Sequence, residues 1–308
     1  MAVYTQVSSE DVAAFLRGYD LGDYVRHEGI TQGVENTNYH LFTTKGRYIL
    51  TIFEKRIDPA SLPFVFGFMS HLAEQDLKVP HVLGQGMLMG KPAALTEYLV
   101  GKDLHRDAIT ADHCRQFGVT LAQMHKASHG YTAQRDNPVG INTWRKLLDS
   151  VRQHDGTMMP EAVVAPILRD FGALDHSLLP GGAIHADLCQ DNVFFDEQDK
   201  LSGVIDFYFS CRDAFVYDLA VGVNSWCFDT ANDLIDARLV GLIQGYESVR
   251  VLNDVERGAW EVVRRAAALR MFSTRLYDWV FTPADADVKK HDPNEYLVKM
   301  ETECPLPQ

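Results

Sequence analysis

The sequence predicts an α+β fold with two lobes, a β-rich N-terminal lobe and a mainly helical C-terminal lobe. Short stretches rich in β-branched and aromatic residues fill most of residues 26–100. Apolar residues at helical spacing dominate residues 101–308. A chain of 308 residues is also too long for one ordinary compact core, so two lobes are expected.

Residues 1–25 are expected to contain an opening helix. The run Ser8-Ser9-Glu10-Asp11 precedes apolar residues at helical spacing, which is typical of a capped amphipathic helix. In the rest of the N-terminal lobe we predict an antiparallel meander that contains one helix. The strands are expected at 27–31, 39–44, 48–53, 82–87 and 93–98, and the helix at 61–75.

The C-terminal lobe is expected to combine long helices with a small β segment. Helical periodicity predicts helices at 110–128, 161–171, 213–227, 233–248 and 254–280. The β segment is expected at 183–185, 193–195 and 201–207. The tail from about Pro283 is polar and weakly patterned, so loose packing is expected there.

Composition excludes several classes of partner. The formal net charge of −13 argues against a nucleic-acid surface, which needs a basic patch. No run of about 18 uncharged apolar residues and no secretory leader pattern are found, so a membrane partner is not expected. The five cysteines are scattered without a C-x-x-C pair, which fits a reducing, cytoplasmic location.

One spaced motif points to phosphoryl transfer. His185, Asp187 and Asn192 form the pattern H-x-D-x-x-x-x-N, and Asp206 follows fourteen residues later after a hydrophobic stretch. A kinase needs a carboxylate at the attacking hydroxyl, and an amide oxygen plus a second carboxylate on Mg²⁺. We therefore assign catalysis to Asp187, with Asn192 and Asp206 as ligands of Mg²⁺ on ATP.

Other motifs carry less weight. The tripeptide H-x-D alone is more often a loop histidine and a turn aspartate, and only its conjunction with the offset Asn192 and with Asp206 favours a kinase. His125 and His129 have zinc-binding spacing but lack a third ligand. The glycines from Gly84 to Gly90 do not match the dinucleotide-binding pattern.

The chain resembles the aminoglycoside phosphotransferase and choline kinase superfamily, and within it the bacterial homoserine kinases of this fold. The resemblance covers nearly the whole chain and is carried by 29–39, 49–54, 62–64, 185–195, 203–208, 217–219, 224–227 and 275–279. It implies a protein-kinase-like fold. It also implies phosphorylation of L-homoserine by ATP, a step of threonine biosynthesis.

The same resemblance implies how the nucleotide is bound. Protein kinases place a phosphate-binding lysine on the third strand, but Thr51 occupies that position here. We therefore expect the phosphates to contact backbone amides of the turn at 33–38, although an ordinary hairpin turn is the alternative. The nucleotide-binding residues expected are Gly33, Val34, Glu35, Asn36, Thr37, Asn38, Thr51, and, at the adenine, Glu97 and Leu99.

Supporting and substrate residues are also implied by the resemblance. His185 is expected to support the catalytic loop, and Asp218 to brace it from a helix start, where a plain helix-opening acid is the alternative. Homoserine carries an ammonium, a carboxylate and a hydroxyl, which calls for mixed polar side chains. Candidates, each equally able to be structural, are Asp213, Asn224, Trp226, Arg275, Tyr277 and Asp278.

Two alternatives stay open from the sequence. The acceptor could be another hydroxylated metabolite such as choline, methylthioribose or an aminoglycoside, and a choline enzyme should show an aromatic cage. The missing lysine also leaves room for a catalytically silent binding module. The presence of Asp187, Asn192 and Asp206 argues against that second alternative.

Overall fold

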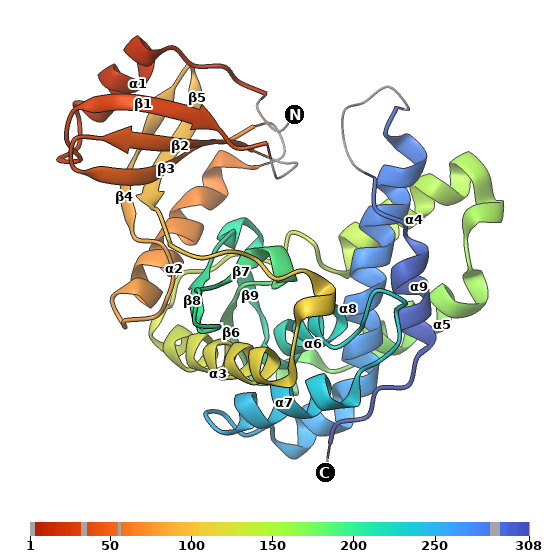
Figure 1. The fold of residues 1–308 in the computed structure, drawn as a ribbon. Coiled ribbons are helices and arrows are strands. Elements are labelled where there is room, and N and C mark those ends of the chain that lie inside the picture. The colour runs from red at the N-terminus through yellow and green to blue at the C-terminus, as the bar shows by residue number, and fades with distance from the viewer. Residues whose placement is uncertain (1–3, 32–35, 55–56, 284–289, 308) are drawn as a thin grey trace. The chain divides into compact units, whose positions relative to one another are not determined.

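A computed structural model describes residues 4–31, 36–54, 57–283 and 290–307. The chain divides into two compact units, residues 1–100 and residues 101–308. The first unit is built on a β-sheet and the second is mainly helical (Figure 1).

The first unit contains a five-stranded sheet in the order β1-β2-β3-β5-β4, and all of its neighbouring strands are antiparallel. Buried and partly buried residues alternate along β2, the period expected of a strand with one covered face. The strands are β1 (Tyr24–Gly29), β2 (Thr37–Thr43), β3 (Gly46–Ile52), β4 (Val82–Leu88) and β5 (Lys91–Glu97).

Two α-helices accompany this sheet. Helix α1 (Ser9–Leu16) begins with a capping box between Ser8 and Asp11, as the sequence predicts. Its buried Val12 and Leu16 join the apolar core of the sheet, so α1 belongs to the same compact unit as the strands. Helix α2 (Leu62–Ala73) buries most of its apolar side chains.

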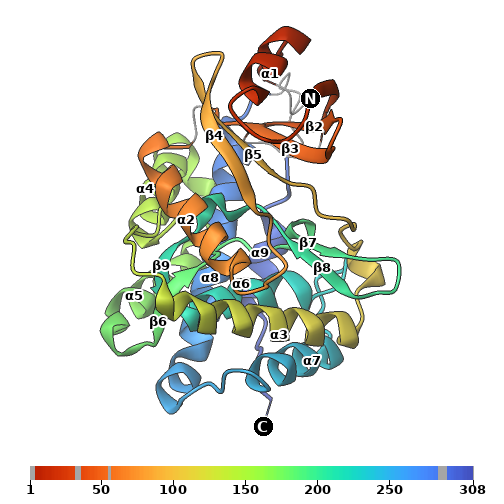
Figure 2. The same cartoon turned by 90° about the vertical axis from the view of Figure 1, so that its left-hand side faces the viewer.

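The second unit is organised around the long helix α8, which packs against α4, α5, α6 and α9 (Figure 2). Its helices are α3 (Ala111–Ala127), α4 (Ile141–Asp155), α5 (Glu161–Ala173), α6 (Phe215–Trp226), α7 (Asp236–Glu247), α8 (Asp254–Phe281) and α9 (Asn294–Glu301). Short 3₁₀ turns lie at 59–61, 106–108, 128–130, 156–158, 176–178, 190–192 and 207–209. No helix in the described parts of the chain has the length and apolar character needed to cross a bilayer.

Helices α3 and α7 pack with their backbones in close contact. A Cβ atom at Gly118 would overlap the carbonyl oxygen of Leu242, and one at Gly245 would overlap that of Arg115. Any larger residue at these two positions would force the helices apart. This packing fixes α3, which carries His125 toward the active site.

Two small antiparallel sheets lie among these helices. Strand β6 (Gly181–Ile184) pairs with β9 (Cys211–Ala214), and β7 (Val193–Phe195) pairs with β8 (Leu201–Val204). Residues 213–214, which helical periodicity predicts to be part of a helix, instead lie at the end of β9, and α6 begins at Phe215. The predicted strand at 201–207 ends at Val204.

The structure corrects two further predictions. Helix α4 was not predicted, although its buried Trp144, Leu148 and Val151 recur at helical spacing. The tail after Pro283 is not loosely packed throughout, because α9 packs against α8 and buries Tyr296 and Met300.

Candidate active site

The predicted catalytic loop, His185 to Asn192, connects β6 to β7 and is held from helix α6. Asp218 is fully buried, and its carboxylate accepts the backbone N–H of His185 (3.0 Å) and of Ala186 (2.8 Å). These bonds hold Ala186 in the left-handed region with φ of 66°, which is uncommon for a residue with a Cβ. Backbone strain of this kind is typical of functional loops.

Asp218 is itself held by His125 of α3. The Nε2 atom of His125 lies 3.1 Å from Asp218, and its Nδ1 lies 2.7 Å from the hydroxyl of Tyr246. Complete burial lowers the pKa of His125, and the contact with Asp218 offsets only part of this effect. Burial opposes ionisation of Asp218, but hydrogen bonds from His125 and the backbone outweigh it and lower the pKa of Asp218. The pair is therefore a neutral imidazole that donates to a carboxylate.

His185 is placed to support the loop. Its Nε2 donates to the carbonyl oxygen of Ile205 (2.9 Å), and its Nδ1 accepts the backbone N–H of Asp187 (3.3 Å). Burial lowers the pKa of His185, which favours this neutral state. Both ring nitrogens are used within the protein, so a direct chemical role is not needed to explain the residue.

The far end of α6 anchors the second half of the loop. The indole N–H of Trp226 donates to the carbonyl oxygen of Leu188 (3.1 Å). The hydroxyl of Ser225 donates to the side chain of Gln190 (2.9 Å), which donates in turn to the Ser225 carbonyl. A helix that is buried along its whole length therefore fixes the loop at both ends.

The two predicted metal ligands lie on adjacent segments. The backbone N–H of Ile205 donates to the carbonyl of Asn192 (2.9 Å), so Asp206 follows directly beside Asn192. Asn192 donates its amide N–H to the Asp187 carbonyl (2.8 Å), and its amide oxygen accepts no bond among the described residues. Asp206 is exposed and has a left-handed φ of 64°. One amide and one carboxylate oxygen suit Mg²⁺, which completes its shell with water and phosphate oxygens.

Asp187 has a partner that the sequence analysis missed. The Nη1 atom of Arg270, in α8, donates to Oδ1 of Asp187 across 2.8 Å. The Arg270 side chain is only 4% exposed, and its Nε has no hydrogen-bond partner among the described residues. Arg270 lies 83 residues after Asp187 in a helix without a recognisable motif, so only the tertiary structure reveals it.

The predicted phosphate-binding turn is described in part. Gly33, Val34 and Glu35 lie outside the described residues. Asn36, Thr37 and Asn38 use their side chains internally, through bonds to the backbone N–H of Glu54, the carboxylate of Glu54 and the hydroxyl of Thr51. Asn36 and Asn38 use only their amide oxygens in these bonds, and the contact of phosphate with the backbone amides stays a prediction.

The two predicted adenine contacts lie at one end of β5. The backbone N–H of Glu97 donates to the carbonyl of His81 (2.9 Å), and its side chain is partly buried. Leu99 follows the strand in irregular backbone and is partly buried. The adenine role of both residues stays a prediction.

Two predicted substrate residues are corrected. Asn224 is buried, and its amide bonds to the backbone carbonyl (2.9 Å) and guanidinium (3.3 Å) of Arg264. Trp226 is fully buried, stacks on Phe117 and bonds to the catalytic loop. Both side chains serve the core and the loop, so neither is placed to contact a substrate.

The other substrate candidates on α8 lie toward its C-terminal end. Arg275 pairs with Glu295 of α9 (2.6 Å) and lies over the ring of Tyr296. Tyr277 packs on Phe281, and Asp278 is partly buried. The remaining candidate, Asp213, is the penultimate residue of β9 and lines a cavity whose wall includes no residue of the catalytic loop.

A sheet unit, a helical unit and a braced H-x-D-x-x-x-x-N loop followed by a metal-type aspartate together define a phosphotransferase with a protein-kinase-like fold. Residues 26–252 match the model of the phosphotransferase enzyme family. The chain belongs to this family. Its fold class is therefore the one that the sequence predicts.

Curated relatives and solved structures agree with this assignment. The chain is 44% identical to the homoserine kinase of Sinorhizobium fredii, over 97% of this chain and 94% of that protein. Identity to the homoserine kinase of Gluconacetobacter diazotrophicus is also 44%, over 97% and 96% of the two chains.

Two solved structures share the fold at low identity. An amicoumacin kinase in complex with AMP-PNP and Ca²⁺ matches with a TM-score of 0.71 at 12% identity, over 96% of this chain and 94% of that one. The Plasmodium vivax ethanolamine kinase matches with a TM-score of 0.65 at 13% identity, over 98% and 96%.

Proposed function

We propose that the protein is a homoserine kinase, which transfers the γ-phosphate of ATP to the hydroxyl of L-homoserine and gives O-phospho-L-homoserine. The observation that carries the proposal is 42–44% identity to curated homoserine kinases over 96–97% of the chain. Solved structures of choline and aminoglycoside kinases share the fold at 11–18% identity.

The catalytic loop supports this chemistry. Asp187 accepts the proton of the substrate hydroxyl as the oxygen takes the phosphoryl group. His185 and Asp218 hold the loop backbone so that this carboxylate keeps its position. Asn192 and Asp206 hold Mg²⁺, which neutralises charge on the phosphates when the nucleotide is bound.

Arg270 supplies a reason for an amino-acid substrate. A buried guanidinium beside the base offers several N–H donors, and guanidinium groups pair well with carboxylates. We place the homoserine carboxylate against Arg270. This contact fixes the hydroxyl at Asp187 and disfavours acceptors that lack a carboxylate, such as choline.

The test is kcat/KM for L-homoserine, L-serine, choline, methylthioribose and kanamycin at one ATP and Mg²⁺ concentration. L-homoserine should exceed every other compound by orders of magnitude, because a polar site discriminates strongly against substrates that leave its groups unpaired. L-serine tests length: with its carboxylate anchored, its shorter side chain holds the hydroxyl away from Asp187. Higher kcat/KM for any other compound would refute the homoserine assignment.

A further inference from the structure

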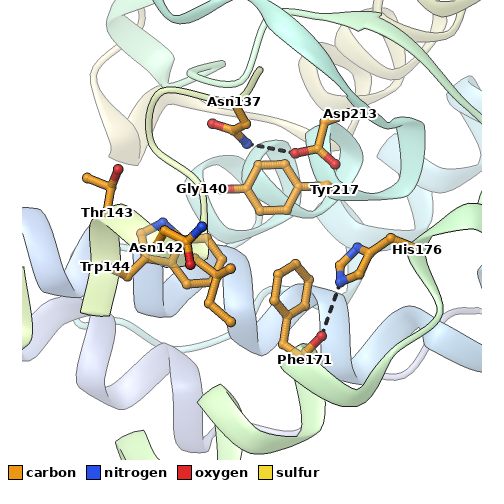
Figure 3. A pocket seen from close by; sticks show the side chains of 10 residues that line it. Asn137, Gly140, Asn142, Thr143, Trp144, Phe171, His176, Asp213 and Tyr217 are labelled. Carbon is orange, nitrogen blue, oxygen red and sulfur yellow. Dashed lines mark hydrogen bonds between the residues drawn. The ribbon is translucent and has the colours of Figure 1, made fainter. Parts of the chain in front are cut away.

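The helical unit contains a cavity of about 260 Å³ that the proposed reaction does not use. Its wall comes from the loop before α4, the first turn of α4, the end of α5, strand β9 and helix α6 (Figure 3). At about 30 Å³ per water molecule, the volume corresponds to eight or nine waters. A small organic molecule therefore fits.

One wall of this cavity carries a carboxylate without a cation. Asp213 accepts a hydrogen bond from the amide of Asn137 (2.7 Å) and one from the backbone N–H of Ala214 (2.7 Å). No ion pair to Asp213 is found among the residues that the structure describes. Burial raises the pKa of Asp213, since the charged form is poorly compensated. A cation bound in the cavity would supply the missing compensation.

Much of the cavity wall is aromatic, and it contains an unpaired hydroxyl. The hydroxyl of Tyr217 is buried and has no hydrogen-bond partner in the described chain. The ring of Tyr217 is parallel to that of Trp144, and Trp144 also packs on Phe171. Aromatic faces attract ammonium groups, and a buried hydroxyl without a partner is unfavourable.

The wall contains further polar residues, Asn142, Thr143 and His176. His176 donates from Nε2 to the carbonyl oxygen of Phe171 (3.1 Å). The carboxylate of Asp213 and the aromatic walls together suit a ligand that brings N–H donors and a positive charge.

We propose that this cavity binds a small primary ammonium compound at a site separate from the phosphoryl-transfer site. None of the lining residues belongs to the catalytic loop. Asp213 pairs in register with Gly182, five residues before Asp187 along the chain. The cavity nevertheless lies next to a residue that holds the catalytic loop. Tyr217 of the cavity wall directly precedes Asp218, which accepts the backbone N–H groups of the loop.

The experiment uses the full chain without nucleotide or homoserine, so it does not depend on the proposed function. n-Butylammonium is titrated by calorimetry or ligand-observed NMR, with butyrate as the anionic comparison and 1-butanol as the uncharged comparison. n-Butylammonium should bind saturably in the millimolar range, as expected for so few atoms, and butyrate and 1-butanol should bind more weakly. Asp213→Asn should weaken n-butylammonium binding about 10- to 100-fold, and Tyr217→Phe about 3- to 10-fold.

Two matched variants define the outcome. Asp170→Asn removes an equal charge on exposed α5, next to lining residue Phe171, and should bind as wild type. Asp187→Asn should also keep the affinity. The proposal is overturned if wild type does not bind, if Asp213→Asn or Tyr217→Phe binds as tightly as wild type, or if Asp187→Asn abolishes binding. Since Tyr217→Phe removes only an unpaired hydroxyl, it remains informative should Asp213→Asn unfold.

Discussion

Arg270 and Asp187 form a hydrogen-bonded ion pair in which Nη1 and Oδ1 are 2.8 Å apart, and the arginine side chain is almost entirely buried. The pair links the loop after β6 to the middle of α8. A base that is already paired keeps its rotamer, and the remaining donors of the guanidinium can receive a substrate carboxylate. We therefore propose that Arg270 positions Asp187 and contributes to substrate specificity.

The first prediction concerns Arg270→Gln. We expect kcat/KM for L-homoserine to fall at least 10²-fold, because a charge-assisted contact and the position of the base are both lost. 3-Aminopropan-1-ol, which is homoserine without the carboxylate, should lose far less, so the preference for homoserine should shrink. The measurement is kcat/KM for both compounds in both proteins. Arg265→Gln, on the same helix, is the control. Equal losses of kcat/KM for both compounds in Arg270→Gln would show that Arg270 has only a structural role.

The second prediction is that Asp187→Asn folds normally and loses about 10²- to 10⁴-fold in kcat, the usual contribution of a positioned base. Homoserine and nucleotide should still bind, since the amide retains one oxygen toward Arg270. Single-turnover rates and equilibrium binding separate the two effects. Near-normal turnover would remove Asp187 from the catalytic role.

The third prediction tests the metal site through Asp206→Asn, which tolerates the left-handed backbone better than alanine. Nucleotide binding should weaken in the presence of Mg²⁺ much more than in its absence, because the lost charge touches the cation. Calorimetry with and without Mg²⁺ gives both values. Asp199→Asn is the control, as Asp199 is also exposed with positive φ but lies in the β7–β8 turn. Equal losses with and without Mg²⁺ would make Asp206 structural.

The parts of the site that are close in sequence could be predicted. Asp187, Asn192 and Asp206 share one loop and the next strand end, so their spacing reflects the geometry directly. The position of Asp218 came from the resemblance. By contrast, Arg270 and His125 reach the site from α8 and α3, and no local pattern distinguishes them from other helix residues.

The errors have a common physical cause. Asn224 and Trp226 belong to stretches that resemble related kinases. Because α6 is buried along its whole length, similarity of its residues can reflect packing as well as substrate contact. Helix α9 was missed because its polar residues are satisfied only in the tertiary structure. Glu295 of α9 pairs with Arg275 of α8 as well as with the buried Lys299, and the contact with α8 is one that sequence periodicity does not reveal.

The fourth prediction is that Thr51→Lys, which restores the general kinase pattern, will not raise kcat/KM for ATP. The hydroxyl of Thr51 donates to the side chain of Asn38 (2.7 Å) in a buried position of β3. Lysine would remove this bond and bury an unpaired ammonium, so the free energy of unfolding should fall by about 1–3 kcal/mol. Thr51→Val separates loss of the bond from the added charge. A clear gain with ATP would contradict the backbone-amide account of phosphate binding.

The last prediction concerns pH and the buried pair His125–Asp218. The pKa of His125 is lower in the folded protein than its ordinary value of 6.5, so the unfolded chain binds a proton that the folded chain excludes. The stability contributed by neutral His125 is therefore present above about pH 6.5 and is lost as the pH falls below it. Asp218 acts in a lower pH range, since its depressed pKa means that its contribution to stability is lost only below about pH 3.8.

One excluded proton changes the free energy of unfolding by about 1.4 kcal/mol per pH unit. In urea unfolding between pH 6.5 and 5, His125→Gln should show a smaller slope than wild type, with a difference of at most about this amount, and the control is the exposed His129→Gln. Identical slopes for wild type and His125→Gln would show that His125 is protonated in the folded protein, and would require a different account of how Asp218 holds the catalytic loop.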